Sequence, residues 1–315
     1  NRRQLEEFHR KLSSLRFLDP ACGCGNFLVI TYRELRLLEL DILRELHKDR
    51  ESRVLDISRI VWLDVDRFHG IEIEEFPAQI AQVALWMTDH QMNLRISEEF
   101  GSYYHRLPLR TSPNIVYGPE KGNALRIDWS TVIAPKDLSF ILGNPPFVGK
   151  KEQTPSQKAE VMRTFTSVRG AGVLDYVACW YRKAADYMAA NPAICAAFVS
   201  TNSITQGEQV GILWKDLLSR GVHIHFAHRT FQWSSEARGK AAVHCVIIGF
   251  GLHDIPGKTL FDYETPQADP HAISVARINP YLVDGPEIIL TTRSHPLSSI
   301  PEVTSGSFAL DDGTY

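Results

Sequence analysis

Two hydrophobic periodicities alternate along residues 15 to about 250 of this 315-residue chain. Short apolar runs bounded by turn-forming residues predict buried β-strands, because a strand that is covered on both faces is apolar at successive positions. The stretches with this pattern are LRFLDPA, RFHGIEI, LSFILGN, AICAAFVS, VHIHFAH and AAVHCVIIGF. Between most of these runs, apolar residues recur at helical spacing, which predicts an intervening helix.

The helical spacing also predicts which side chains face the core. A helix should follow the strand that ends near residue 19, with core positions at Phe27, Ile30, Leu35, Leu38, Ile42 and Leu46. A second helix should span about residues 76–93, with core positions at Ile80, Val83, Leu85 and Trp86. Further helices are expected over VLDYVACWYRKAADYM and EQVGILWKDLLSR.

Strands and helices that alternate on this scale indicate a doubly wound α/β fold with a mostly parallel sheet. We expect residues 1–14 to end a preceding helical segment and residues 15–250 to form the α/β domain. After residue 251, Pro, Gly and Asp become frequent, so residues 251–315 are expected to be a linker and the beginning of another domain. The start at Asn1 and the end at SFALDDGTY lead us to expect a fragment of a longer protein.

Composition argues against several protein classes. Hydrophobic residues make up 44% of the chain, which suits a globular domain with a large core. The five cysteines are odd in number and lack CxxC pairs, so neither a disulfide framework nor a zinc site is predicted and a reducing cytoplasm is expected. No stretch has the roughly 18 apolar residues of a membrane span, and NRRQLEEFHRKLSSL has the pattern of a polar helix rather than a signal peptide.

Charge is distributed unevenly along the chain. Residues 150–183 contain seven Lys or Arg against three acids, whereas residues 251–315 contain nine acids against three bases. A positive strip of this kind could meet a polyanion, and a solvated helix face would account for it equally well.

A Gly-rich turn, DPACGCGNFL, joins the first predicted strand to its helix. Gly23 and Gly25 would let a ligand approach the backbone and the free N–H groups of the helix N-terminus. The dinucleotide fingerprint would need a third Gly where Leu28 stands. Because the carboxylate of Asp19 at the strand end would repel phosphates, the turn favours a ligand with an ammonium or sulfonium group.

The second strand ends in GIEIEE, where Glu72 could accept hydrogen bonds from ribose hydroxyls. It lies 47 residues beyond Gly25, much farther than the roughly 20 residues that are typical of dinucleotide binders. The spacing therefore argues against NAD. A solvated strand end is the alternative interpretation of Glu72.

The third stretch of interest, GNPPF, follows the strand-like run FIL. Pro145 and Pro146 have no N–H and fixed φ angles, so they end the strand in a rigid turn. The carbonyl groups of such a turn point outward, which predicts an edge rich in hydrogen-bond acceptors beside Asn144.

In their order along the chain, DPACGCGNFL, GIEIEEFPAQIA, GNAL and GNPPF resemble motifs I to IV of S-adenosylmethionine-dependent amino-methyltransferases that act on DNA adenine. The motif order resembles the gamma class. HFAHRTFQW, NPYLVDG and TTRSHPL are similar to segments of MmeI-like enzymes, which fuse restriction and modification in one chain. The resemblance covers about residues 15–300 and implies a bacterial enzyme of a restriction-modification or phage-defence system. It also implies a class I methyltransferase fold, a double-stranded DNA partner, and further nuclease and target-recognition domains.

The resemblance also implies roles for individual residues. The methionine part of the cofactor would be held by Asp19, Ala21 and Gly23. Glu72 would take its ribose hydroxyls with Ile73 against the adenine, and Asn123 and Ala124 would lie at the adenine edge. Many relatives carry Asp where this chain has Asn123, which keeps an acceptor but removes the charge.

In the target base, the lone pair of the adenine N6 amine is delocalised into the ring. The Asn144 side-chain oxygen and the Pro145 carbonyl would accept the two N6 hydrogens and direct the lone pair at the sulfonium methyl. Phe147 would stack on the base after it has flipped out of the duplex. By the same resemblance, Phe231 would be the second aromatic wall, with Trp233 as the competing candidate.

Other chemistries are disfavoured or remain alternatives. His223, His225 and His228 follow strand alternation without a Cys or carboxylate at ligand spacing, so no metal is predicted. The chain has no Pro-Cys dipeptide for attack on cytosine C5. Cytosine N4 or a protein glutamine amide could be the methyl acceptor in place of adenine, and a non-catalytic DNA-binding module that keeps the fold is a third class.

Overall fold

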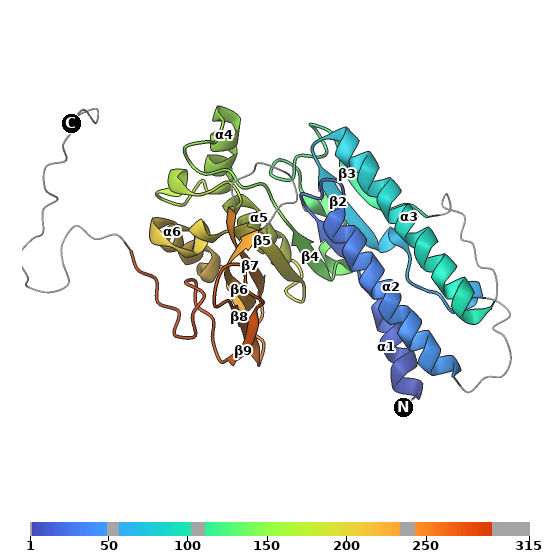
Figure 1. Ribbon diagram of the computed structural model, residues 1–315. Helices are drawn as coiled ribbons and strands as arrows, with labels where there is room; N and C mark the ends of the chain where they lie inside the picture. The colour runs from blue at the N-terminus through green and yellow to red at the C-terminus, as the bar shows by residue number, and fades with distance from the viewer. Residues whose placement is uncertain (1, 49–56, 102–110, 234–242, 292–315) are drawn as a thin grey trace, which may run out of the picture.

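The computed structural model describes residues 2–48, 57–101, 111–233 and 243–291. Within these ranges nine strands form one sheet in the order β3-β2-β1-β4-β5-β7-β6-β8-β9 (Figure 1). Their bounds are β1 Phe17–Asp19, β2 Phe68–Glu72, β3 Asn114–Tyr117, β4 Phe140–Gly143, β5 Cys195–Thr201, β6 His223–Trp233, β7 Val243–Gly251, β8 Lys258–Asp262 and β9 His271–Val275.

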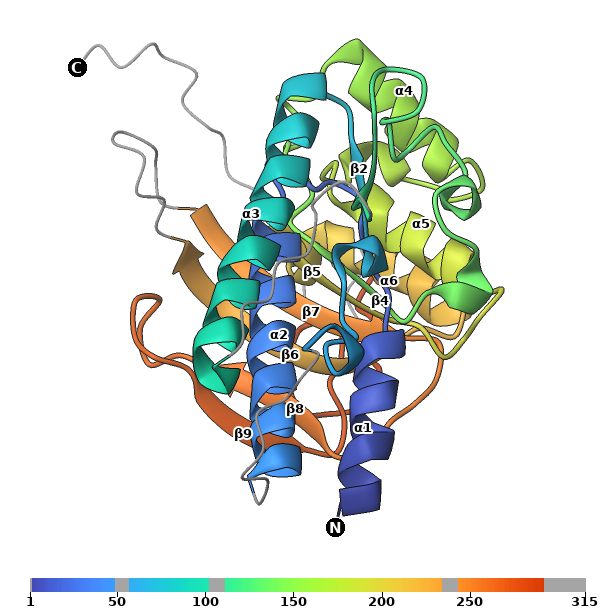
Figure 2. The same ribbon diagram turned by 90° about the vertical axis from the view of Figure 1, so that its right-hand side faces the viewer.

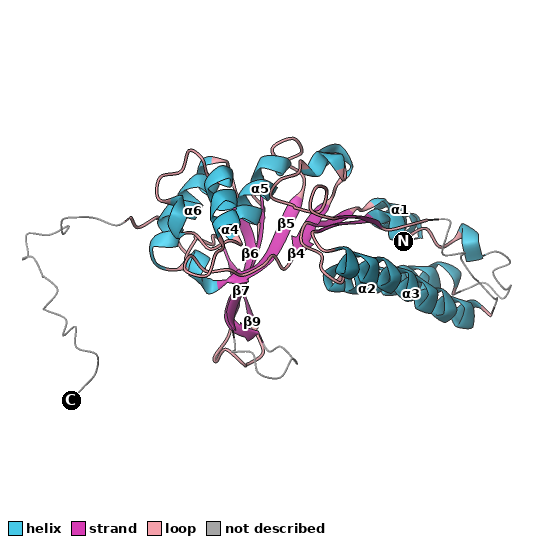
Figure 3. Ribbon diagram, turned by 90° about the horizontal axis from the view of Figure 1, so that it is seen from above, coloured by secondary structure: helices cyan, strands magenta, loops and turns pink. Residues whose placement is uncertain are grey.

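Helices cover both faces of the sheet. The helices α2 and α3 lie on one face and α4, α5 and α6 on the other (Figures 2 and 3). The helix bounds are α1 Arg2–Ser14, α2 Asn26–His47, α3 Glu75–Phe100, α4 Pro155–Thr164, α5 Ala178–Met188 and α6 Gly207–Ser219. Short 3₁₀ helices lie at Ile57–Arg59, Val65–Arg67, Trp129–Thr131, Pro135–Asp137, Ala171–Val173 and Asn202–Thr205.

The five strands from β3 to β5 run parallel, and β7 lies antiparallel between β5 and β6. This arrangement confirms the predicted doubly wound, mostly parallel α/β fold. Because the strands are parallel, the carboxyl ends of β1, β2 and β4 meet at one edge of the sheet, where ligands bind in open α/β sheets. The apolar runs did not predict β3, β8, β9 or α4.

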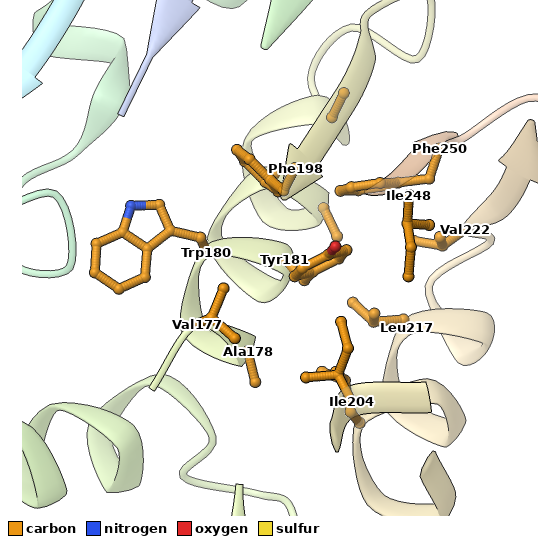
Figure 4. Packing of buried hydrophobic residues seen from close by; sticks show 14 of the residues in the cluster. Val177, Ala178, Trp180, Tyr181, Phe198, Ile204, Leu217, Val222, Ile248 and Phe250 are labelled. Atoms are coloured by element: carbon orange, nitrogen blue, oxygen red, sulfur yellow. The ribbon is translucent and has the colours of Figure 1, made fainter. Parts of the chain in front are cut away.

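The largest apolar core lies between the sheet and the helices α5 and α6. Tyr181 is fully buried there, with its ring 5.1 Å from that of Phe250 and 5.4 Å from that of Phe198 (Figure 4). The Tyr181 hydroxyl lies 2.7 Å from the Ser200 hydroxyl, so its polar atom has a partner. Aromatic pairs of this kind add stability beyond the area that they bury.

The predicted core faces of α2 and α3 were partly wrong. Ile30 and Leu38 of α2 are 47% and 38% exposed. In α3, Val83 is 50% exposed and Ile80 is 36% exposed. Ile42 and Leu85 are buried as predicted. The remaining buried positions of α2 include polar residues, so apolar spacing alone could not identify the buried face.

A charged network fills part of the interface between α2 and α3. Arg36 is fully buried and donates to the Asp89 carboxylate at 2.6 Å and to the Asn93 side-chain oxygen at 2.7 Å. Asp89 also accepts a hydrogen bond from the Tyr32 hydroxyl. Buried charges are tolerated when they are paired and hydrogen-bonded, and this pairing explains why a polar stripe lies inside.

The sheet continues past residue 250, because β8 and β9 add two strands to it. The expected linker at residues 251–315 therefore begins with residues that pack in the α/β domain, while residues 292–315 lie outside the described ranges. None of the helices in the described ranges has a stretch apolar and long enough to cross a membrane.

Candidate active site

A cavity of about 420 Å³ lies at the edge of the sheet where β1, β2 and β4 end. Small-molecule sites in proteins usually have volumes of about 300–1,000 Å³. The cavity is lined by Pro20, Ala21, Ile71, Glu72, Ile73, Gly122, Asn123, Ala124, Asn144, Pro146, Gln157, Tyr176 and Trp180. A larger hollow of about 710 Å³ between α6 and residues 290–291 is lined by none of the predicted site residues, so we assign the site to the smaller cavity.

The structure brings several predicted residues together and leaves others outside the cavity. Ala21, Glu72, Ile73, Asn123, Ala124 and Asn144 all line it. Four more predicted residues lie within two positions of a lining residue but do not line the cavity themselves, namely Asp19, Gly23, Pro145 and Phe147. Phe147 packs instead against the large apolar core.

The turn after β1 is held by hydrogen bonds to acidic side chains. The Ala21 N–H donates to Asp19 Oδ1 at 3.0 Å, and the Gly23 N–H donates to Glu72 Oε2 at 2.8 Å. Gly25 has a φ of 81°, and a Cβ there would lie 2.8 Å from the Cβ of Ala81. The turn therefore needs glycine for its conformation and for its close approach to α3.

Asp19 lies beneath this turn with only 1% of its surface exposed. A Cβ at Gly143 would be 2.5 Å from Asp19 Oδ1, so the glycine before Asn144 makes room for the carboxyl. Burial raises the pKa of Asp19 to about 7, with the Ala21 N–H opposing this rise and the Glu72 charge adding to it. Asp19 therefore acts on the cavity through the turn rather than as a lining residue.

Glu72 ends β2 and lines the cavity with both oxygens already accepting backbone N–H groups. Oε1 accepts from Glu74 at 2.9 Å and Oε2 accepts from Gly23 at 2.8 Å. Each carboxylate oxygen has a second lone pair, so the group can still accept hydrogen bonds from a diol. The adjacent Ile73 is 46% exposed and presents an apolar surface beside it.

The GNAL loop packs tightly against the end of β2. A Cβ at Gly122 would lie 1.9 Å from the Glu72 carbonyl oxygen, so only glycine fits there. Asn123 is held at both ends of its amide, because Oδ1 accepts the Leu125 N–H at 3.0 Å and Nδ2 donates to Glu160 Oε1 at 3.0 Å. Ala124 is buried beside it, and its carbonyl accepts the Trp129 indole N–H.

The Asn-Pro-Pro-Phe turn follows β4 directly. Asn144 is half-buried, Pro145 is buried and Pro146 is exposed at the cavity. Within the described part of the chain, the side-chain amide of Asn144 has no protein hydrogen-bond partner. Its oxygen and nitrogen are therefore available to a molecule in the cavity.

The sequence interpretation missed Tyr176, Trp180 and Gln157 as lining residues. The rings of Tyr176 and Trp180 meet edge to face, with centroids 5.3 Å apart, and the Trp180 indole N–H donates to the Pro20 carbonyl at 3.1 Å. Their i, i+4 spacing was the only local signal, and it is equally typical of a core helix face.

The predicted second aromatic wall lies outside this cavity. Phe231 stacks on Tyr263 with ring centroids 5.5 Å apart, and the Tyr263 hydroxyl lies 2.7 Å from Nδ1 of His228. Trp233 stands opposite Val243 in the sheet, but its side chain is outside the described atoms. The choice between Phe231 and Trp233 stays a prediction.

The structure brings His225 together with Cys195 and His253, which the sequence spacing had not suggested. Their nearest ligand atoms lie within 4.8 Å of one another, at the end of β5 opposite to the cavity. One ring nitrogen of His225 bonds to the His253 carbonyl, and one of His253 bonds to the Pro192 carbonyl. We assign no ion to this group, because these hydrogen bonds already account for its packing.

Comparison with known proteins identifies the family. The family model "MmeI, DNA-methyltransferase domain" matches residues 1–262. The chain is 37% identical over 314 residues to DNA methyltransferase A of Bacillus subtilis, covering 98% of this chain and 34% of that protein. It is 58% identical to the type IIL restriction-modification enzyme MmeI in its complex with DNA, with a TM-score of 0.91 over 96% of this chain and 40% of that one.

The chain thus spans about a third of the length of the curated relative. The family match covers every residue that lines the cavity, and the structural match covers nearly the whole chain. Both agree with the fold and with the resemblance found in the motifs. The chain therefore belongs to the family of MmeI DNA-methyltransferase domains.

Proposed function

We propose that this chain transfers a methyl group from S-adenosylmethionine to the N6 amine of a flipped-out adenine in double-stranded DNA, as part of a restriction-modification system. The observation that carries the proposal is the unpartnered side-chain amide of Asn144 in a cavity shared with Glu72 and Asn123, among the residues that the structure describes. The amide reaches the cavity with its donors and its acceptor unused by the described residues, so a ligand can bond to it directly. An exocyclic NH₂ group can do so.

The residues at the cavity fit the cofactor. When bound, S-adenosylmethionine supplies an activated methyl group on its sulfonium. Glu72 would accept the ribose hydroxyls, and Ile73 and Ala124 would pack against the adenine. The Ala21 segment would hold the methionine part, with the Asp19 charge beneath it and Gly23 fixing the turn.

The acceptor turn would orient the target base. The Asn144 oxygen and the Pro145 carbonyl would accept the two N6 hydrogens, which draws the nitrogen toward tetrahedral geometry and exposes its lone pair. Phe147 would stack on the base. Because Phe147 now packs against the core, this role requires its ring to present one face to the turn, with Phe231 or Trp233 opposite.

We propose that the basic strip within residues 150–183 contacts DNA. Five of its seven Lys and Arg side chains are candidates for this contact. Lys150, Lys151, Lys158, Arg163 and Arg169 are exposed. Arg182 instead pairs with Asp216, and Lys183 donates to the Ile127 carbonyl, so these two are not part of the strip. Base reading, nuclease activity and a complete target-recognition domain would belong to other parts of the same polypeptide, as the greater length of the relatives suggests.

The test is nucleoside mass spectrometry on DNA from cells that lack adenine methylation and express the whole protein. N6-methyladenine is expected with the wild type and is expected to disappear with Asn144→Ala. Asn114→Ala, at an exposed asparagine on the edge strand β3, is the matched control and should retain methylation.

Other outcomes separate the alternatives. N4-methylcytosine in place of N6-methyladenine would keep the turn chemistry and change the base. A methylated protein glutamine without a methylated base would point to an amide acceptor. Cofactor binding without any methylated product would leave a DNA-binding module that keeps the fold, and would overturn the proposal.

A further inference from the structure

Glu160 of α4 does not line the cavity, yet it is bonded to residues on two of its walls. The carboxylate accepts from Asn123 Nδ2 at 3.0 Å and from the Tyr176 hydroxyl, and Arg126 Nε donates to it at 2.6 Å. Asn123 belongs to the loop after β3, and Tyr176 precedes α5. One buried side chain therefore joins segments that are 53 residues apart in sequence.

The bonding pattern fixes the charge of each partner. Burial alone would raise the pKa of Glu160, but the Tyr176, Arg126 and Asn123 donors outweigh it and lower that pKa below its ordinary value. The pKa of Tyr176 is raised by burial and by Glu160, so its hydroxyl stays protonated and donates. Glu160 is the charged acceptor, and Asn123 must be a neutral donor.

We propose that Glu160 is a positioning residue that holds Asn123 and Tyr176 in place on two walls of the cofactor site, and that Asn123 is an amide because a second carboxylate could not lie beside Glu160. The inference rests on the proposed function. It goes further by assigning a role to Glu160, which lies outside the motifs, and by explaining why the GNAL loop has a neutral residue at Asn123.

The variant Asn123→Asp would place a second carboxylate beside Glu160, with the two nearest oxygens about 3 Å apart in the present geometry. Like charges that share a site raise the pKa of one carboxyl, so one of them takes up a proton or the pair separates. Separation would move the loop that carries Ala124, whose other side packs on the end of β2. Asn123→Asp is therefore expected to weaken the cofactor site.

The discriminating variant reverses the pair. In Asn123→Asp with Glu160→Gln, the introduced amide nitrogen can donate to the introduced carboxylate, which still accepts the Leu125 N–H, while the amide oxygen accepts from the Tyr176 hydroxyl. Arg126 loses its acceptor on residue 160, because it shares Oε1 with Asn123 in the wild type. The double variant should therefore regain what Asn123→Asp loses. If the two side chains did not act through their shared hydrogen bond, the losses from the two substitutions would add instead.

The experiment measures S-adenosylhomocysteine binding to the whole protein by calorimetry at pH 8. We expect Asn123→Asp to weaken binding by about 10- to 50-fold, the size of one disrupted buried interaction between charged groups. Glu160→Gln should weaken it by about two- to fivefold, and the double variant should bind within about threefold of the wild type. Glu208→Gln, on α6 and outside the network, is the control.

Thermal unfolding supplies a readout that does not need the cofactor. In Asn123→Asp, one carboxyl of the pair has a raised pKa in the folded protein. The stability that this gives is complete below the ordinary carboxyl pKa and is lost as pH rises through the raised pKa. The Tm of Asn123→Asp should therefore fall further below that of the wild type from pH 5 to pH 8. The double variant should lack this trend. Unchanged binding and Tm in Asn123→Asp, or a double variant worse than either single one, would overturn the pairing.

The two proposals fail separately. A wild type that binds no S-adenosylhomocysteine would overturn the proposed function, and the pH dependence of Tm would still decide the pairing. A wild type that binds while Asn123→Asp binds equally well would leave the function intact and overturn the role of Glu160.

Discussion

The two ends of the cavity differ in whether their polar groups already have protein partners. At the end formed by β1 and β2, both Glu72 oxygens accept N–H groups and the Asn123 amide is bonded at both ends. At the other end, the Asn144 amide has no partner among the described residues. The first end is preorganised before a ligand binds, whereas the second is completed only by its ligand.

This contrast follows from the local backbone. Gly25 and Gly122 allow contacts that any Cβ would block, so the end that we propose to hold the cofactor, here called the cofactor end, is assembled by close packing of loops. Pro145 and Pro146 have no N–H groups and cannot saturate the acceptors of their own turn. An arrangement of this kind suits tight binding at one end and alignment of a reacting group at the other.

The largest expected effect is at the end of the cavity that contains Asn144, here called the acceptor end. Asn144→Ala should lower kcat by about 10²–10³-fold, since it removes an acceptor aimed at the charge that develops in the transition state. The dissociation constant of S-adenosylhomocysteine should stay within about twofold, because Asn144 has no bond to the cofactor-side residues. Single-turnover kinetics and calorimetry measure the two quantities. Equal losses in both would mean that the two ends are not separate.

Glu72→Gln should have the reverse pattern. Gln keeps the size of the side chain but removes one acceptor and the charge, so cofactor binding should weaken by about 10- to 100-fold. The rate constant at saturating cofactor should change little, because in the proposed arrangement the methyl acceptor bonds to Asn144 and Pro145 rather than to Glu72. Glu74→Gln, at the exposed neighbour, is the control. A lower kcat without weaker cofactor binding would contradict the assignment of Glu72.

The position of the cavity was predictable, because Asp19 and Glu72 end their strands and Asn144 directly follows β4, and the parallel order of the sheet brings these ends to one edge. The roles of these residues stay predictions. The contributions of Glu160, Tyr176 and Trp180 were not predictable, since they depend on how α4 and α5 pack. The buried face of α2 was missed for another reason: Arg36 and Glu39 are inside as paired charges, which apolar periodicity cannot detect.

The Asp19 carboxyl gives the cofactor end a pH dependence that the acceptor end lacks. Since burial raises the pKa of Asp19 to about 7, the free protein holds a proton there at pH 6 that a cationic cofactor would expel. Cofactor binding should therefore weaken by up to about tenfold from pH 8 to pH 6 and release protons at the lower pH. Calorimetry in buffers of different ionisation enthalpy counts these protons.

Asp19→Asn is the control for this titration, and it should flatten the profile. In the free protein, the same carboxyl lowers the folding stability as pH rises, whereas it strengthens cofactor binding over the same range. Its raised pKa gives a contribution to stability that is complete below the unfolded value of 3.8 and is lost as pH rises through 7. Asp19→Asn should therefore gain Tm relative to the wild type as pH rises from 5 to 8. A parallel pH profile in both proteins would exclude Asp19 as the titrating group.

The smallest expected effect lies outside both ends, on the basic strip. Lys158 and Arg163 are exposed on α4, whose buried face carries Glu160. Replacing both with Gln should weaken DNA binding several-fold and lower the slope of log K against log salt by about one to two, because each phosphate contact contributes nearly one unit. Cofactor affinity should stay unchanged, since both side chains are exposed and neither bonds to Glu160, Asn123, Tyr176 or Arg126 among the described residues. Lys215→Gln, on α6, is the matched charge control. If the slope stays the same while affinity falls, the two residues contact bases or support the fold rather than contact phosphates. If affinity and slope both stay the same, the strip is a solvated helix face.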